Sequence, residues 1–146
     1  MERIPYIIEQ FAAAGITIDV QKAEKLEKLC CYMVEYNKNV NLTSITEFSE
    51  VVVKHFVDSV LPFFMVDIPQ GSSFIDVGTG AGFPALPLLV VRSDLKGTLC
   101  DSLNKRCVYL ELVCKEIGVK AEIIHARSEE LGRKKRECFG FATARA

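Results

Sequence analysis

The sequence predicts a mixed α/β domain that contains a parallel sheet and is preceded by a helical region. Apolar residues recur at helical spacing through the first part of the chain, whereas short β-type runs alternate with helical runs from Ser72 onward. The composition of the 146 residues, 49% hydrophobic and 25% charged, is that of one ordinary globular domain. We therefore divide the chain into an N-terminal helical region, residues 1–70, and a sheet-containing region, residues 71–146.

Composition and charge exclude several classes of function. The formal net charge of −1 offers no excess of positive charge that would by itself indicate a nucleic-acid or membrane partner. No apolar run reaches the roughly 18 to 20 residues of a membrane span, and the N-terminus lacks the features of a secretory signal, so a soluble, cytoplasmic protein is expected. Six cysteines without a C-x-x-C motif, beside two histidines, indicate neither a metal site nor a disulfide framework.

The helical region is predicted to contain four helices. The first runs from about Ile4 to Gly15, where a glycine suits a left-handed cap. The second begins near Asp19. Thr46 is predicted to cap a third helix, and another short helix is predicted at Val60–Phe64.

The second region is predicted to form parallel strands joined by right-handed helical crossovers. The strands are predicted at Phe74–Val77, Thr98–Asp101, Glu122–His125 and roughly Phe139–Thr143. The helices between them are predicted near Pro84–Arg92, with Pro84 in the first turn, and at Lys105–Ile117, ended by Gly118. A doubly wound sheet usually has five or more strands, so we expect a fragment of a longer protein from which the remaining strands are absent.

A glycine-rich segment lies between the first strand and the following helix. Gly78, Gly80 and Gly82 alternate there, and such glycines let a ligand approach the backbone and the helix N-terminus closely. The dinucleotide fingerprint G-x-G-x-x-G is not met, because Phe83 stands at its third glycine position. The pattern D-x-G-x-G-x-G, which begins at Asp76, instead resembles the first motif of class I methyltransferases that use S-adenosylmethionine.

Three carboxylates are candidate cofactor ligands. Asp76 could hold the ammonium group of the methionyl end of S-adenosylmethionine, directly or through water. Asp101 ends the next strand, at about the interval where an acidic residue binds ribose hydroxyls; the alternative is that it caps the turn that follows. Ser128 and Glu129 follow the third strand, where related folds contact adenine, and a helix cap by Ser128 is an equal alternative.

With these residues in view, the chain resembles the bacterial 16S rRNA guanine-N7 methyltransferase family, also called glucose-inhibited division protein B. The resemblance covers about residues 26–146. It rests on five segments in order, N-L-T-S at 41–44, K-H-F-V-D-S at 54–59, D-V-G-T-G-A-G-F-P at 76–84, D-S-L-N-K-R at 101–106 and T-A-R-A at 143–146.

The resemblance implies a Rossmann-like methyltransferase sheet, S-adenosylmethionine as cofactor, and 16S rRNA in the small ribosomal subunit as partner. The implied cofactor residues are Asp76, Gly78, Gly80, Gly82, Phe83, Asp101, Ser128, Glu129 and Arg145, and the family commonly has alanine where this chain has Ser128. The implied substrate-side residues are His55, Asp58 and Ser59, with Lys105 and Arg106 near the RNA. The alternative for the last two is an ion pair with Asp101 or with a phosphate-sized anion.

Methyl transfer to guanine N7 needs no general base, because N7 carries a lone pair and no proton, so no catalytic residue is assigned. Three alternatives stay open: another S-adenosylmethionine-dependent methyltransferase, a non-catalytic fragment that binds cofactor or RNA, and a nicotinamide oxidoreductase. We expect a monomer that involves neither membrane nor metal. His55 could equally be a hydrogen-bonded core histidine, His125 is predicted to be structural, and the basic run 133–136 is predicted to be a solvated connection.

Overall fold

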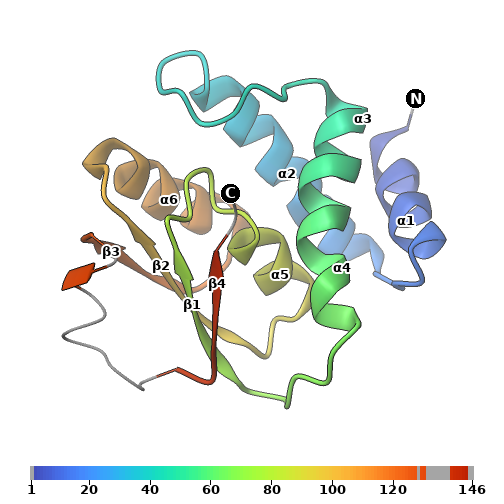
Figure 1. Cartoon of the computed structure of the whole chain (residues 1–146). Helices are drawn as coiled ribbons and strands as arrows, with labels where there is room; N and C mark the ends of the chain where they lie inside the picture. The colour runs from blue at the N-terminus through green and yellow to red at the C-terminus, as the bar shows by residue number, and fades with distance from the viewer. Residues whose placement is uncertain (1, 128, 131–138, 145–146) are drawn as a thin grey trace.

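The computed structural model describes residues 2–127, 129–130 and 139–144. It contains a helical N-terminal part and a parallel sheet (Figure 1). The helical part consists of α1 (Arg3–Ala13), α2 (Val20–Tyr36), α3 (Phe48–Glu50), the π-helical segment η1 (Val51–Val57) and α4 (Asp58–Phe64). The sheet part consists of β1 (Ser73–Val77), α5 (Ala85–Val91), β2 (Lys96–Asp101), α6 (Asn104–Ile117), β3 (Ala121–His125) and β4 (Phe141–Ala144). No helix in the described part of the chain is long and apolar enough to cross a membrane.

The first helix ends and the second begins as predicted, whereas the third does not begin as predicted. Gly15 has a φ of +83° just after α1, and the Asp19 carboxylate accepts a hydrogen bond from the Lys22 amide at 2.8 Å at the start of α2. The predicted cap at Thr46 is wrong, because the side chain of Glu47 accepts the Glu50 amide instead. The two helices predicted in this stretch form one continuous run, with η1 between α3 and α4.

The four predicted strands form one parallel sheet in the order β3-β2-β1-β4. The predicted crossover helices are also present, and Gly118 ends α6 in the left-handed conformation with a φ of +72°. Several boundaries differ from the prediction by one or two residues. Pro84 precedes the first residue of α5 instead of lying in its first turn, β2 starts at Lys96 instead of Thr98, and β4 starts at Phe141 instead of Phe139. The mixed α/β fold class is confirmed.

The two faces of the sheet are packed differently, because successive side chains of a strand point to opposite faces. Phe74 and Leu99 belong to a large apolar cluster that also contains side chains of α1, α2, η1, α5 and α6. Ile75 and Cys100 belong to a much smaller cluster. The helical region and the sheet region therefore share one core, and this core fixes the glycine segment at the carboxyl end of β1.

Candidate functional site

The glycine segment follows β1 directly and turns the chain into α5. Gly78 and Gly80 adopt left-handed conformations, with φ of +64° and +60°, which favour glycine. A Cβ added to either residue would meet no atom within 4 Å, so this side of the segment is open. Gly82 differs, since a Cβ there would lie 2.4 Å from a Leu86 methyl group. Gly82 therefore serves packing against α5, and its predicted cofactor contact stays a prediction.

Asp76 lies beneath this segment and is fully buried. The Thr79 hydroxyl donates to its Oδ2 at 2.7 Å, and the Thr143 hydroxyl donates to its Oδ1 at 3.0 Å. The Ala85 amide also donates to Oδ2, at 3.3 Å. These contacts fix the glycine segment to β4 and to the start of α5. The predicted contact of Asp76 with an ammonium group stays a prediction.

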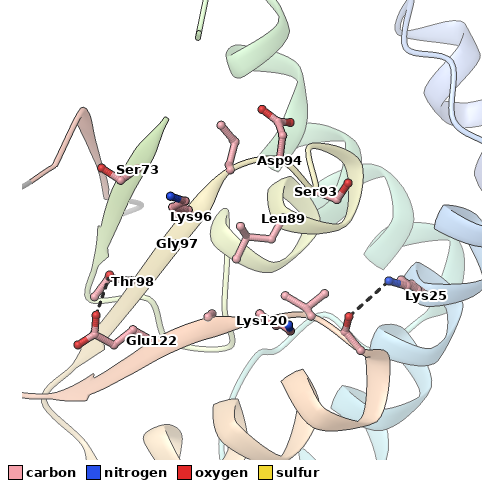
Figure 2. Close-up of a pocket in the computed structure, with 14 residues that line it drawn as sticks. Lys25, Ser73, Leu89, Ser93, Asp94, Lys96, Gly97, Thr98, Lys120 and Glu122 are labelled. Atoms are coloured by element: carbon pink, nitrogen blue, oxygen red, sulfur yellow. Dashed lines mark hydrogen bonds between the residues drawn. The ribbon is translucent and has the colours of Figure 1, made fainter. Parts of the chain in front are cut away.

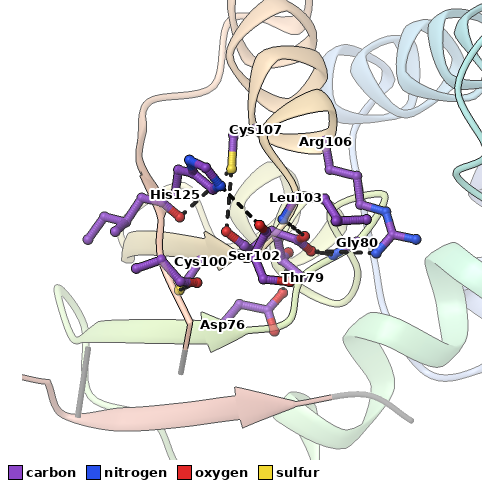
Figure 3. Close-up of polar contacts among 12 residues, drawn as sticks. Asp76, Thr79, Gly80, Cys100, Ser102, Leu103, Arg106, Cys107 and His125 are labelled. Carbon is purple, nitrogen blue, oxygen red and sulfur yellow. Dashed lines mark hydrogen bonds and ion pairs between the residues drawn. The ribbon is translucent and has the colours of Figure 1, made fainter. Parts of the chain in front are cut away.

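Asp101 ends β2, and its carboxylate contacts the glycine segment and the start of α6. The Gly80 amide donates to Oδ2 at 2.9 Å, and the Leu103 amide donates to Oδ1 at 2.9 Å. Arg106 extends toward the same carboxylate from α6, with its Nη1 3.9 Å from Oδ2 (Figure 3). The turn contact and the ion pair that the sequence left open are therefore both present, and Asp101 is only 3% exposed.

A cavity of about 300 Å³ opens beside Asp101 at the carboxyl edge of the sheet. It brings together three of the predicted cofactor residues, Gly78, Asp101 and Glu129. Its other lining residues are Val77, Cys100, Ser102, Ala126 and Arg127. Ser128 and Arg145, also predicted at this site, and the basic run 133–136 lie outside the described residues.

Two buried thiols, those of Cys100 and Cys107, contact backbone carbonyl groups around this cavity. Burial raises the pKa of the Cys100 and Cys107 thiols, which therefore stay protonated at neutral pH. The Cys100 thiol donates to the Ala126 carbonyl at 3.3 Å, and the Cys107 thiol lies 3.6 Å from the Asp101 carbonyl. His125 Nε2 lies 2.9 Å from the Ser102 carbonyl, in agreement with its predicted structural role (Figure 3). These contacts join β2, β3 and α6 around the cavity.

A second cavity, of about 380 Å³, lies on the other side of the glycine segment, toward the helical region. His55 and Phe83 contribute to its wall as a stacked pair, with ring centroids 4.4 Å apart. His55 Nε2 hydrogen-bonds to the Thr43 hydroxyl at 2.9 Å, and Arg106 lies at the same cavity. Both rings are buried, so the structure shows His55 as a hydrogen-bonded core residue, and its predicted substrate contact stays a prediction.

Asp58 and Ser59 line a third cavity, of about 350 Å³, together with Pro84 and Thr143. Asp58 is exposed and Ser59 is buried. The three substrate-side candidates of the sequence therefore come from one helical run but face two cavities. His55 lies in η1, and a π-helical turn of this kind is frequent at functional sites.

A larger cavity, of about 730 Å³, lies at the opposite edge of the sheet (Figure 2). It is lined by the first residues of the strands and by Lys25, whose ammonium group donates to the Gly118 carbonyl. None of the predicted site residues is among its lining residues. In parallel α/β sheets ligands bind at the carboxyl ends of the strands, so volume alone does not mark the site here. No cluster of three or more candidate metal ligands occurs among the residues that the structure describes.

Three residues that shape the site were not predicted from the sequence. Thr143 holds Asp76, and Thr43 holds His55. Asn37 accepts the Leu42 and Thr43 amides with its side-chain oxygen and so orders the segment that carries Thr43. These amides lie five and six residues after Asn37, beyond the two-residue span of the usual asparagine turn, so residue type alone did not indicate the contact. The partners of Thr143 could not be found from the sequence either, because they depend on the pairing of β1 with β4.

Comparisons with known proteins agree with the family resemblance that the sequence motifs indicate. A family model, GidB, described as rRNA small subunit methyltransferase G, matches residues 22–146. Proteins named ribosomal RNA small subunit methyltransferase G from Thermoanaerobacter sp. (strain X514) and Clostridium perfringens (strain 13 / Type A) are 42% and 45% identical to the chain. The matches cover 98% and 92% of this chain, but only 61% and 57% of the respective relative. The chain thus spans about three fifths of the length of these curated relatives.

A solved structure shows the same fold at low sequence identity. A Plasmodium falciparum structure described as a protein-L-isoaspartate O-methyltransferase, in complex with S-adenosyl-L-homocysteine, superposes with a TM-score of 0.58 at 11% identity. The match covers 99% of this chain and 73% of that one, and it supports the predicted Rossmann-like arrangement of the sheet. The resemblance predicted from the motifs is confirmed by the family match: the chain belongs to the GidB family, the small-subunit rRNA methyltransferase G family.

Proposed function

We propose that the chain binds S-adenosylmethionine in the cavity beside Asp101 and serves methyl transfer to N7 of a guanine in 16S rRNA. The proposal rests on one observation: a buried carboxylate and an open glycine segment lie at the same cavity. Asp101 and Gly78 both line it, and a Cβ at Gly78 or Gly80 would point into open space. The donor set fits an adenosine group, because a carboxylate accepts hydrogen bonds from two vicinal hydroxyls.

Three residues that line the cavity and two residues next to it have roles in this proposal. Asp101 accepts the two ribose hydroxyls, Gly78 and Gly80 allow the methionyl end to approach the backbone, and Glu129 lies toward the adenine. Asp76 supports the segment from beneath. The bound cofactor supplies a methyl group that its sulfonium charge already activates. Ser128 and Arg145 belong to the same proposal on the strength of the family motifs alone.

The chemistry of the acceptor explains why the site contains no evident base. Guanine N7 has an in-plane lone pair and no proton to lose, so orientation of the base toward the methyl group is the main requirement. The stacked pair of His55 and Phe83 gives the glycine segment a rigid wall on the side of the helical region. Asp58, Ser59, Lys105 and Arg106 are proposed on the RNA side. The proposed partner is the small ribosomal subunit, and the proposed setting is a cytoplasmic monomer without metal.

Calorimetry with S-adenosylhomocysteine tests the cofactor assignment. We expect binding of S-adenosylhomocysteine and no binding of NAD, and we expect Asp101→Asn to weaken the affinity at least tenfold. Glu24→Gln, on the exposed face of α2, is the matched control and should leave the affinity unchanged. Circular dichroism of each variant separates loss of the site from loss of the fold. Absence of binding by the wild-type chain would contradict the proposal.

Methyl incorporation tests the acceptor. Radiolabelled S-adenosylmethionine should label small ribosomal subunits at guanine N7 and leave free guanine nucleotides unlabelled. Label in another macromolecule would favour a different methyltransferase of the same cofactor class. A nicotinamide oxidoreductase is disfavoured by Phe83, which is buried against His55 where the dinucleotide fingerprint needs a glycine.

A non-catalytic chain that binds cofactor or RNA is the second candidate. The chain covers 61% of the length of a relative with which it is 42% identical, so methyl transfer by this chain has to be measured separately from cofactor binding. Binding of S-adenosylhomocysteine without methyl incorporation would identify this second candidate. An intact relative, assayed in parallel, shows whether the subunits and the assay conditions permit the reaction.

A further inference from the structure

Among the described residues, the Asp101 carboxylate has three partners, and one of them is unlike the other two. The Gly80 and Leu103 amides each donate a hydrogen bond at 2.9 Å, and both belong to backbone that tight turns hold in place. Arg106 is a side chain on α6, and its Nη1 is 3.9 Å from Oδ2, beyond hydrogen-bond distance. Arg106 is therefore the partner that can leave without rearrangement of the backbone.

The hydrogen-bonding capacity of a carboxylate makes this difference important. Two oxygens accept about four hydrogen bonds, and the two amides use one position on each oxygen. The two hydroxyls of a ribose need the remaining two positions. Arg106 approaches Oδ2, so it lies near the second acceptor position of that oxygen. Asp101 is only 3% exposed, so little of its carboxylate is accessible to another group. A ribose and Arg106 therefore compete for the same part of the carboxylate.

Arg106 also reaches the second cavity, on the other side of the glycine segment. It lines that cavity together with Thr43, His55 and Phe83, and its side chain is 32% exposed. Figure 3 shows Arg106 extending from α6 toward the side of Gly80 in the glycine segment. A guanidinium that loses its carboxylate partner here stays beside the cavity and needs another anion.

We infer that Arg106 exchanges partners during the reaction cycle. It pairs with Asp101 before the methyl donor binds, and it is released to a phosphate of the RNA when the ribose hydroxyls occupy Asp101. Donor binding and RNA binding then favour each other, because a coupling free energy between two ligands acts equally in both directions. This inference rests on the proposed function of the cavity.

The first test separates competition from direct contact. Arg106→Gln should bind both adenosine and S-adenosylhomocysteine about two- to fivefold more tightly than the wild-type chain, the size expected of a half-exposed ion pair. The gain should shrink at high salt, because salt screens the pair in the wild-type chain. Lys115→Gln, which removes an exposed charge from the last turn of α6, should change neither affinity.

The second test measures the coupling. A single-stranded oligoribonucleotide that contains the target guanine should bind the wild-type chain more tightly in saturating S-adenosylhomocysteine than in its absence. The enhancement should be lost in Arg106→Gln and kept in Lys115→Gln.

Each outcome has one meaning. No binding of S-adenosylhomocysteine by the wild-type chain would overturn the proposed function and this inference with it. If Arg106→Gln left the affinity for S-adenosylhomocysteine unchanged or weakened it, the inference alone would be overturned. A loss of affinity for S-adenosylhomocysteine but not for adenosine would show that Arg106 contacts the amino-acid end of the donor. RNA affinity that does not respond to S-adenosylhomocysteine would also overturn it.

Discussion

Three glycines in one short segment have different physical reasons to be glycine. The sequence pattern treats Gly78, Gly80 and Gly82 alike, and all three have positive φ. A Cβ at Gly78 or Gly80 would point into open space, whereas a Cβ at Gly82 would collide with Leu86 in the core. The first two are consistent with close approach of a ligand, and the third is required by the packing of α5.

We predict that alanine substitutions separate these roles. Gly82→Ala should lower the free energy of unfolding by about 3 kcal/mol, because left-handed strain and overpacking both act. Gly78→Ala should lower it by only about 1–2 kcal/mol, from left-handed strain, but should weaken S-adenosylhomocysteine binding more than tenfold. Urea unfolding and calorimetry measure the two effects. Equal destabilisation by the two substitutions would contradict the packing argument.

Two adjacent cysteines provide a second prediction at this scale. Burial raises the pKa of the Cys30 thiol to about 12, whereas Cys31 is exposed on the same helix. Because the thiolate is the reactive form, iodoacetamide at about pH 8 should alkylate Cys31 and leave Cys30 intact in the folded chain. Mass spectrometry of proteolytic fragments measures both sites. Equal labelling of the two under native conditions would show that α2 does not pack as described, and labelling in urea is the control.

Strand β4 depends on a side-chain contact as well as on its backbone ladder. It pairs in parallel with β1 at one edge of the sheet, and the Thr143 hydroxyl donates to the fully buried Asp76 carboxylate. The same carboxylate accepts the Thr79 hydroxyl in the glycine segment. A buried carboxylate thus joins β1, β4 and the segment that the proposed cofactor contacts.

We predict that Thr143→Val lowers the free energy of unfolding by about 1–3 kcal/mol, because it removes a donor from a buried acceptor without changing the shape of the side chain. Thr143→Ser keeps the hydroxyl and should recover most of the loss. Urea unfolding measures the stability, and amide hydrogen exchange should show faster exchange in β4 of the valine variant. A valine variant as stable as the wild-type chain would mean that Asp76 does not need this donor.

The sequence predicted the helices and strands better than it predicted the residues at which they begin. The spacing of apolar residues located all four strands and both crossover helices. Each of these elements buries an apolar face, so its apolar residues recur at regular intervals in the sequence. The helix that starts at Phe48 was misplaced, because Thr46 is the better cap by residue type and Glu47 supplies the bond. The π-helical turn of η1 was also missed, since its residues have the same apolar pattern as an α-helix.

At the scale of the whole molecule, the position of Gly78 beside Asp101 could be predicted from the sequence, and the wall formed by His55 and Phe83 could not. Gly78 follows the end of β1 and Asp101 is the last residue of β2, and the carboxyl ends of adjacent parallel strands meet at one edge of the sheet. The contact of His55 with Phe83 depends instead on how the helical region packs on the sheet region. Such packing arises from one core shared by distant parts of the chain, and no local pattern in the sequence specifies it.

An ion pair in the sheet region also holds the end of the helical region by a hydrogen bond. Arg92, just after α5, binds Asp94 with two hydrogen bonds of 2.8 Å and donates to the Ile68 carbonyl at 3.2 Å. The Gly71 amide donates to Asp94 at 3.0 Å. The segment that leads from the helical region into β1 is therefore held to the turn before β2.

We predict that this ion pair contributes to the pH dependence of stability. The Arg92 guanidinium, with the Gly71 amide, holds the pKa of Asp94 well below its usual range. A carboxylate whose pKa is lower in the folded chain stabilises the fold above its unfolded pKa of about 3.9, and the contribution is lost as pH falls toward the folded pKa.

Asp94→Asn should therefore lower the free energy of unfolding at about pH 7 and make its decline below about pH 4 shallower. Urea unfolding across this pH range measures both effects, with Glu24→Gln as an exposed-carboxylate control. If the variant lost stability equally at both ends of the range, the ionised carboxylate would not be the cause. The contact would then act through its shape and hydrogen bonds, which asparagine keeps only in part.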